Sequence, residues 1–273
     1  MDRWFVVACA ALSVTLCAAP RAAADPTGPT QFLRSSDLYQ ALKLSIGYHF
    51  SSGHYGTSDT TQISYVPLVI RAELGRLTLR GTIPYLSITG PPGVIIGPGG
   101  APIPGKADGL GDIFFATGYL LPRPYTWPAW VPFTEIVGLV KFPTASRSDG
   151  LGTGEFDFGV AGDLTWAFGR LTPFATIGYR FLGNPPGVLP ENELSNVLGA
   201  SVGGQYQIFT TLSAGLSLDY RQAASAETGE QLELVPFASW KFIRPWSLDV
   251  YALAGLKSGS PDAGFGLQVG YTW

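Results

Sequence analysis

The last nine residues of the chain alternate strictly between apolar residues and small or polar ones. Phe265, Leu267, Val269, Tyr271 and Trp273 would share one face of a strand, and the glycine, glutamine and threonine residues between them would share the other. No helical period of 3.6 residues accounts for this order. The pattern predicts a closing strand with one face in an apolar environment and the other in a polar one.

Residues 1–24 have the features of a secretory signal peptide and do not enter the fold argument. Arg3 supplies a charged start, residues 4–19 form an apolar run, and three alanines at 22–24 form a small-residue cleavage site before Asp25. We therefore expect cleavage of this segment and export of the mature chain.

Both cysteines, Cys9 and Cys17, lie inside this segment. A lipoprotein box ending at Cys9 is an alternative, although few residues precede Cys9 to form an apolar region. The mature chain has no cysteine, which excludes disulfides, thiolate catalysis and cysteine metal sites. Without Arg3, Arg21 and Asp2 it keeps 15 basic and 19 acidic residues, a formal charge of −4. No basic tract exists, so nucleic acid is not an expected partner.

The composition is that of a protein with an apolar exterior. Charged residues make up 14% of the chain and the mean hydropathy is +0.20, whereas ordinary soluble domains carry about 25% charged residues. Yet the mature chain has no run of about 18 apolar residues, so we expect no membrane-spanning helix. Only a closed sheet otherwise satisfies every backbone group in hydrocarbon. The expected fold is an all-β, transmembrane, antiparallel up-and-down β-barrel.

Alternation with a period of two residues recurs along the chain and predicts about twelve strands. Their expected ranges are 40–50, 61–72, 76–86, 110–121, 130–142, 155–168, 171–182, 195–207, 209–221, 231–243, 246–257 and 263–273. Connections after the even-numbered strands are short or proline-rich, and the others are mostly longer. Outer-membrane barrels alternate short periplasmic turns with longer outer loops, so both termini are expected in the periplasm. Ten or fourteen strands remain possible.

The predicted domains are the signal peptide at 1–24, an N-terminal periplasmic segment at 25–39 and the barrel at 40–273. A soluble lipocalin-like barrel or a β-sandwich is the alternative, with its apolar face turned inwards. Tyrosines and tryptophans near the strand ends favour the membrane barrel, where they would form interfacial girdles.

In a membrane barrel the residues opposite the apolar faces line the interior. The candidates are Lys43, Arg80, Asp112, Glu135, Lys141, Asp157, Arg180, Asp219, Arg221, Glu233, Lys241, Phe237 and Tyr251. Their mixed charges fit a rigid, salt-bridged interior or a ring that sets selectivity. The aromatic residues among them fit either packing against loops or a semi-apolar path for a solute. The glycine- and proline-rich segment 90–105 is either a surface loop or a loop folded into the lumen.

Three segments resemble a known family: Gly-Leu-Gly-Asp-Ile at 109–113, Lys-Phe-Pro-Thr-Ala at 141–145, and Leu-Gly-Thr-Gly at 151–154 followed by Phe156 and Asp157. In order and spacing they resemble the MetA-pathway-of-phenol-degradation family of outer-membrane barrels, over about residues 40–273. The family usually has glycine where this chain has Ala145. The resemblance implies an uptake or efflux channel for small, often aromatic, compounds.

The residues themselves allow a structural role for these motifs. Asp112 and Asp157 can accept hydrogen bonds from loop backbone or from Arg80 and Arg180. Glycine permits the tight geometry at a strand start.

An enzyme is not expected. The mature chain has two histidines, His49 and His54, with serines and Asp59 nearby. A surface lipid hydrolase using one of them is the alternative, but no Gly-x-Ser-x-Gly elbow is present. The two histidines with Asp59 would bind a metal only weakly, because no further strong ligand accompanies them. The glycine-rich stretches lack the lysine of a phosphate loop. No metal, cofactor or nucleotide is expected.

These observations predict a channel or facilitator in the outer membrane of a Gram-negative-type bacterium, passing small solutes that include hydrophobic or aromatic ones. The expected partners are outer-membrane lipid, periplasmic chaperones, the barrel-assembly machinery and a small-molecule solute. The oligomeric state is left open. A closed barrel with a structural or anchoring role is the alternative.

Overall fold

The structure, a computed structural model, describes residues 6–7, 41–55, 59–91, 95–96, 105–124, 126–185, 194–225 and 229–273. The predicted signal peptide and N-terminal segment lie outside the described residues, except for Val6 and Val7. These two residues form β1 (Val6–Val7), which pairs with β5 (Ile95–Ile96). In the described part of the chain, no helix has the length and apolar character needed to cross a membrane.

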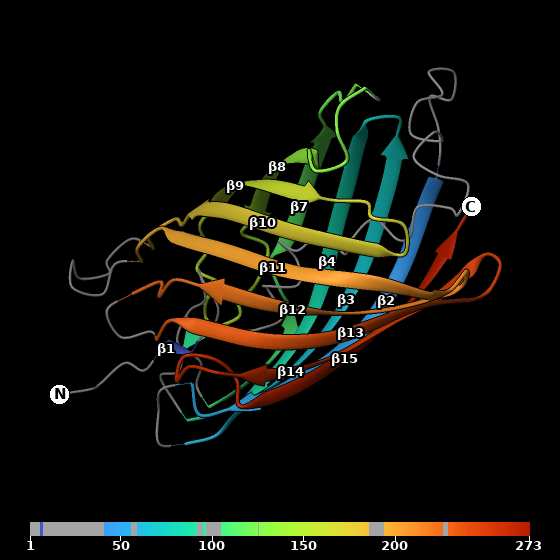
Figure 1. The fold of residues 1–273 in the computed structure, drawn as a ribbon. Helices are drawn as coiled ribbons and strands as arrows, with labels where there is room; N and C mark the ends of the chain where they lie inside the picture. Colours follow the sequence, from blue (N-terminus) through green and yellow to red (C-terminus); the bar gives the residue numbers. More distant parts are fainter. Residues whose placement is uncertain are drawn as a thin grey trace.

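The other described strands form one closed antiparallel sheet (Figure 1). They are β2 (Ala41–Gly53), β3 (Thr61–Leu74), β4 (Leu77–Thr89), β6 (Lys106–Leu110), β7 (Ile113–Leu120), β8 (Phe133–Phe142), β9 (Asp157–Thr165), β10 (Leu171–Phe181), β11 (Val197–Phe209), β12 (Leu212–Arg221), β13 (Gln231–Ile243), β14 (Trp246–Gly255) and β15 (Ala263–Thr272). Apart from β6 and β7, which both pair with β4, each strand pairs with its neighbour in the sequence, and β15 pairs with β2 to close the barrel.

The strands β6 and β7 act as one strand of the barrel. β4 pairs with β6 at one end and with β7 at the other, and Gly111 and Asp112 interrupt the strand between them. Counted this way, the described residues form a twelve-stranded barrel, which confirms the predicted fold class. The connection predicted at 87–109 is shorter than expected, because β4 continues to Thr89 and β6 begins at Lys106.

The two faces of the sheet differ as the alternation predicts. Val202 is 57% exposed and Phe158 is 53% exposed on the outside, while polar side chains such as those of Thr82, Ser201 and Gln205 are buried on the inside. In soluble proteins the distribution is the reverse. The exterior of this barrel therefore suits lipid rather than water.

The closing strand β15 follows the predicted pattern in detail. Phe265, Leu267 and Trp273 are exposed outside, and Gly266 and Gly270 are buried inside. Aromatic contacts continue along the outer face, since the ring centroids of Tyr271 and Trp273 lie 4.6 Å apart. β15 pairs along its length with β2, so the last strand contacts the first strand of the barrel.

We call the two ends of the barrel the loop end and the turn end. The turn end carries short connections at 75–76, 166–170, 210–211 and 244–245, together with the longer, proline-rich connection 121–132. The loop end carries mostly longer connections, including 143–156 between β8 and β9. This arrangement matches the sequence prediction of short or proline-rich connections at one end and mostly longer ones at the other, and it places the clusters described below.

Candidate functional site

Five rings form a continuous band on the inner face of the barrel, which we call the aromatic band. Its members are Phe174 on β10, Phe237 on β13, Tyr251 on β14, His49 on β2 and Tyr65 on β3. The ring centroids of Phe174 and Phe237 lie 6.2 Å apart, and Phe237 is directly paired with Tyr251. The imidazole of His49 stacks on Tyr251 at 5.4 Å and contacts Tyr65 at 5.7 Å.

The strands between these residues contribute glycines where the rings lie. A Cβ atom added at Gly203 of β11 would be 2.5 Å from the ring of Phe174, and one at Gly215 of β12 would be 2.4 Å from the ring of Phe237. A Cβ atom at Gly266 of β15 would be 2.2 Å from the ring of Tyr251. Any larger residue would displace these rings, since glycine in a strand permits such close approach. The band therefore depends on glycine as much as on aromatic residues.

The band also has polar tips. His49 Nδ1 and the hydroxyl oxygen of Tyr251 share a hydrogen bond of 2.8 Å. This contact holds both rings in place and leaves a hydroxyl and an imidazole among otherwise apolar surfaces. Phe237 and Tyr251 were predicted as lining residues from alternation alone, and both side chains lie on the inner face, partly buried.

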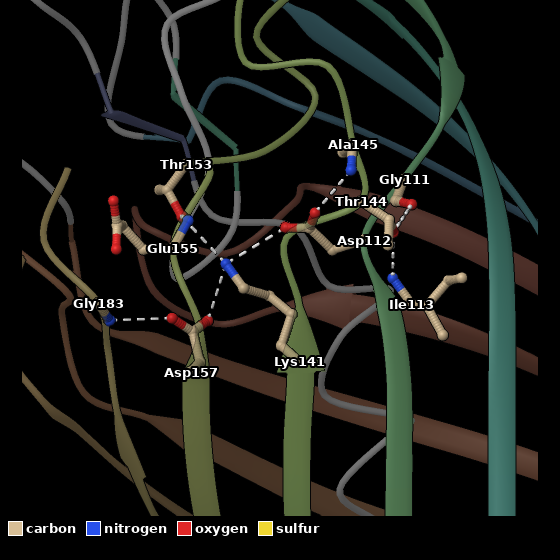
Figure 2. Close-up of polar contacts among 10 residues, drawn as sticks. All are labelled: Gly111, Asp112, Ile113, Lys141, Thr144, Ala145, Thr153, Glu155, Asp157 and Gly183. Atoms are coloured by element: carbon tan, nitrogen blue, oxygen red, sulfur yellow. Dashed lines mark hydrogen bonds and ion pairs between the residues drawn. The ribbon is translucent and has the colours of Figure 1, made fainter.

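A second interior cluster, the ion cluster, lies at the loop end (Figure 2). The ammonium group of Lys141 lies 3.2 Å from Asp112 Oδ2, 3.1 Å from Asp157 Oδ2 and 3.1 Å from the hydroxyl of Thr153. Lys141 is 2% exposed and Asp157 is 0% exposed. Since desolvation of three charges is costly, such a group is stable only when each member keeps its partners.

Backbone groups complete the ion cluster. The N–H of Ala145 donates to Asp112 Oδ1 at 2.9 Å, and the N–H of Gly183 donates to Asp157 Oδ1 at 3.0 Å. The loop backbone thus holds both carboxylates, one of the two arrangements expected from the sequence. Their charged partner at salt-bridge distance is Lys141, rather than Arg80 or Arg180 as expected.

The three motifs of the family resemblance converge in this cluster. Asp112 comes from the first motif, Lys141 from the second, and Thr153 with Asp157 from the third. The hydroxyl of Thr144 links the first two further, donating to the carbonyl of Gly111 at 3.2 Å. Spacing in the sequence did not reveal that these segments meet.

The ion cluster holds connection 143–156 against the interior. Leu151 of this connection is buried against Ile63, Ile88 and Ala107 on the inner faces of β3, β4 and β6. A Cβ atom at Gly109 would be 2.9 Å from Leu151 Cδ1, so the contact is close. The segment 90–105, expected to be either a surface loop or a loop folded into the lumen, lies mostly outside the described residues. Among the described residues, the inward-folded connection is 143–156.

The other predicted lining residues are distributed along the wall. Lys43 pairs with Asp249 at 3.4 Å, Asp219 accepts hydrogen bonds from Ser201 and Ser217, and Arg221 donates to Gln231. Arg80 and Glu135 are half-buried, Arg180 and Glu233 are buried, and Lys241 is exposed beside the turn end. The sequence pattern grouped all of these residues, but the structure separates them into local contacts.

The two histidines have different surroundings. His49 belongs to the aromatic band, and His54 pairs with Asp262 at 2.7 Å on the exposed loop end. The hydroxyl of Ser51 shares a hydrogen bond of 3.0 Å with the hydroxyl of Tyr55. Within the described ranges, no group of three or more His, Cys, Asp or Glu side chains could hold a metal ion.

No protein-family model matches the chain, and no curated protein matches its sequence. The resemblance to the MetA family therefore stays a prediction. Among solved structures, the β domain of the Bordetella autotransporter BrkA is similar, with a TM-score of 0.50 at 10% identity over 87% of this chain and 100% of that one.

Two transport proteins are also similar to this chain. The CymD monoaromatic hydrocarbon channel has a TM-score of 0.48 at 9% identity, over 86% of this chain and 88% of that one. The Pseudomonas putida toluene transporter TodX has a TM-score of 0.45 at 8% identity, over 90% of this chain and 93% of that one. At such identities a likeness concerns the fold alone, which the strand pairing of this chain shows to be a closed antiparallel β-barrel.

Proposed function

We propose that this barrel is an outer-membrane channel or facilitator for small solutes, and that hydrophobic or aromatic compounds are among them. The observation that supports the proposal is the aromatic band. Phe174, Phe237 and Tyr251 present ring surface inside a barrel whose inner wall also carries many polar side chains. An aromatic solute gains contact with these rings that a purely polar wall would not provide.

The strength of contacts between an aromatic solute and these rings suits passage of the solute through the barrel. An aromatic pair contributes about 0.5–1.5 kcal/mol beyond the burial of its area. Conduction needs binding that is favourable enough for entry and weak enough for release. A row of several weak ring contacts meets both conditions, since a solute can move from one ring to the next without leaving a deep energy minimum.

The proposal includes an orientation. The turn end lies in the periplasm with both chain termini, and the loop end faces the outside of the cell. The separation of short and long connections supports this arrangement, which is usual in bacterial outer-membrane barrels. A solute entering from outside would pass connection 143–156 and the ion cluster before it reaches the aromatic band.

Single-channel conductance of the folded mature chain in a planar bilayer tests the proposal. We expect steady ohmic current steps and a reduction of the current by phenol. The variant Phe237→Ala should weaken the phenol block several-fold, on the order of one lost ring contact. Phe158→Ala is the matched control, because Phe158 lies on the outer face, and it should leave the block unchanged. A block that is equal in both variants would contradict the role of the band.

A closed structural barrel is the second candidate function. The ion cluster and Leu151 favour it, because they fix connection 143–156 inside the loop end. This candidate predicts a folded barrel, recognised by its heat-modifiable migration on a gel, that produces no current steps. Conductance by wild-type protein would exclude it.

A further inference from the structure

The inner face of β3 is exposed near the turn end and covered near the loop end. The side chains of Arg71 and Glu73 are 19% and 30% exposed, whereas Ile63 and Tyr65 are 1% and 4% exposed. All four occupy alternate positions of one strand, so they point to the same side of the wall. Their different exposure therefore requires a cover over the loop half of this strand.

A short part of connection 143–156 belongs to this cover. Residues 147–149 of the connection are exposed, while residues 150–153, which we call the tongue, are buried. Leu151 of the tongue packs in one apolar cluster, with Tyr55, Ile63, Tyr65, Ile88 and Ala107. The strands of this cluster are β3, β4 and β6, and none of them is joined directly to the connection. The tongue thus extends along the inside of the loop end to strands other than its own.

The surface under the tongue leads to the aromatic band. Tyr65 belongs to both, since it lies in the apolar cluster and its ring contacts that of His49 at 5.7 Å. Ile63 precedes Tyr65 on the inner face of β3, towards the loop end. With the tongue away, an apolar surface would connect the loop end with the band, and an aromatic solute would gain from contact with it.

Two glycines in the left-handed region bound the tongue. Gly150 is its first residue, Gly154 follows its last residue, and both have a φ of 76°. Glycine adopts this region without steric cost, and hinges are positions that absorb large changes in φ and ψ. The flanking strands are complete without the tongue, because β8 ends at Phe142 and β9 begins at Asp157. Rotation at the two glycines can therefore move the tongue without breaking a strand pair.

The ion cluster holds the tongue through one hydrogen bond. The hydroxyl of Thr153 accepts it from the ammonium group of Lys141 at 3.1 Å (Figure 2). Lys141 keeps its two ion pairs, with Asp112 and Asp157, when the tongue leaves, because all three residues lie outside the tongue. Release of the tongue therefore avoids the large cost of separating buried charges.

We propose that the tongue is a lid over the route from the loop end to the aromatic band. When docked, it covers the apolar surface that ends at Tyr65. When released, it swings about Gly150 and Gly154 and uncovers this surface for an aromatic solute. The inference rests on the proposed function and adds its regulation, so the current steps expected of wild type correspond to openings of the lid.

A reversible bridge between the tongue and the wall tests the lid. Residues 25–273 contain no cysteine, so the double variant Leu151→Cys, Ala107→Cys provides two thiols in one cluster. A short bis-methanethiosulfonate reagent would join them and leave the ion cluster intact. We expect the bridged barrel to show no current steps in a planar bilayer, and the steps to return after dithiothreitol. Equal conductance before and after dithiothreitol would overturn the lid.

The control for the bridge is the single variant Ala107→Cys, treated with the same reagent. Ala107 lies on the wall and not on the tongue, so this variant should conduct in the presence and absence of dithiothreitol. Loss of its current would show that the reagent obstructs the lumen without holding the tongue, and the lid would then lose its support from the bridge.

A second variant tests the hydrogen bond that holds the lid, and it decides if the cysteine pair does not fold. Thr153→Val removes the acceptor of Lys141 and should raise the ratio of open to closed time about tenfold, the effect of one hydrogen bond to a charged group. Thr89→Val is the matched control, because Thr89 is exposed at the end of β4, and it should behave like wild type. An unchanged ratio in Thr153→Val would overturn the lid.

Failure of the lid and failure of the channel give different results. A barrel that conducts equally with and without the bridge would keep the proposed channel and lose the lid. A folded barrel that never conducts, even as Thr153→Val, would lose the channel and the lid with it.

Discussion

The interior of this barrel is filled in two different ways. At the loop end, Lys141 is surrounded by Asp112 and Asp157, and every member depends on its partners. In the aromatic band, Phe174 and Phe237 lie over glycines, and the rings fit only because these glycines have no side chain. The first region is sensitive to the loss of a group, and the second is sensitive to the gain of one.

The largest effect is expected from Lys141→Met, which breaks the first region. Removing the ammonium group leaves two buried carboxylates without their cation, and loss of one partner from a buried ion pair costs about 3–5 kcal/mol. Urea unfolding of the barrel in lipid vesicles measures this cost. The control is Lys241→Met, since Lys241 is exposed, and its effect should stay within about 0.5 kcal/mol. Similar effects of both changes would show that the ion cluster contributes little.

The second region should break with one added methyl group. In Gly215→Ala the new Cβ would lie 2.4 Å from the ring of Phe237 and 2.5 Å from the carbonyl oxygen of Gly204. Such overpacking costs about 1–3 kcal/mol, and the displaced ring should also weaken the phenol block. Both effects can be measured on one preparation, by urea unfolding and by conductance.

The control for this change is Gly81→Ala, where an added Cβ meets no atom within 4 Å. Its unfolding free energy should differ from that of wild type by less than about 0.5 kcal/mol. If both alanine variants are equally stable, the rings are not held by the glycines beneath them.

The smallest effect is expected from an ion pair on the solvent-exposed surface, formed by Glu230 and Lys257. Glu230 at the loop end accepts hydrogen bonds from Lys257 and from the hydroxyl of Tyr220, and both lower the pKa of Glu230. The hydrogen bond to Glu230 raises the pKa of Lys257. Both charged groups are solvent-exposed, so the pair is screened and contributes little to stability.

The sign of the pH dependence follows from the lowered pKa. A carboxyl group whose pKa is lower in the folded state contributes stability above its unfolded pKa and loses it as the pH falls through the folded value. Any advantage of wild type over Glu230→Gln should therefore be present at neutral pH and disappear in acid, below the ordinary glutamate pKa of 4.5. Thermal unfolding of the two proteins at neutral and acidic pH measures this difference. A stability loss as large as that of Lys141→Met would contradict the distinction between buried and exposed pairs.

The strands and their faces were predictable because alternation is a local property of the chain. Each strand was found within a few residues, and Phe237, Tyr251 and Lys141 were assigned to the inner face from parity alone. The alternation of residues between the two faces does not explain the position of Asp112, because Asp112 lies in the interruption between β6 and β7. Its position in the ion cluster comes from the hydrogen bond of the Ala145 N–H and from Lys141, and neither contact is visible in the sequence.

The sequence by itself determined the barrel fold class and the alternation of an apolar outer face with a more polar inner face, since a period of two residues needs no information from distant parts of the chain. The tertiary structure decided which of the inner side chains meet. Contacts across a barrel depend on the register between strands, which sets the height of each residue on the wall. Register places Lys141 between two aspartates and lays Phe237 over Gly215, and it leaves Arg180 beside a glycine without a direct partner among the described residues.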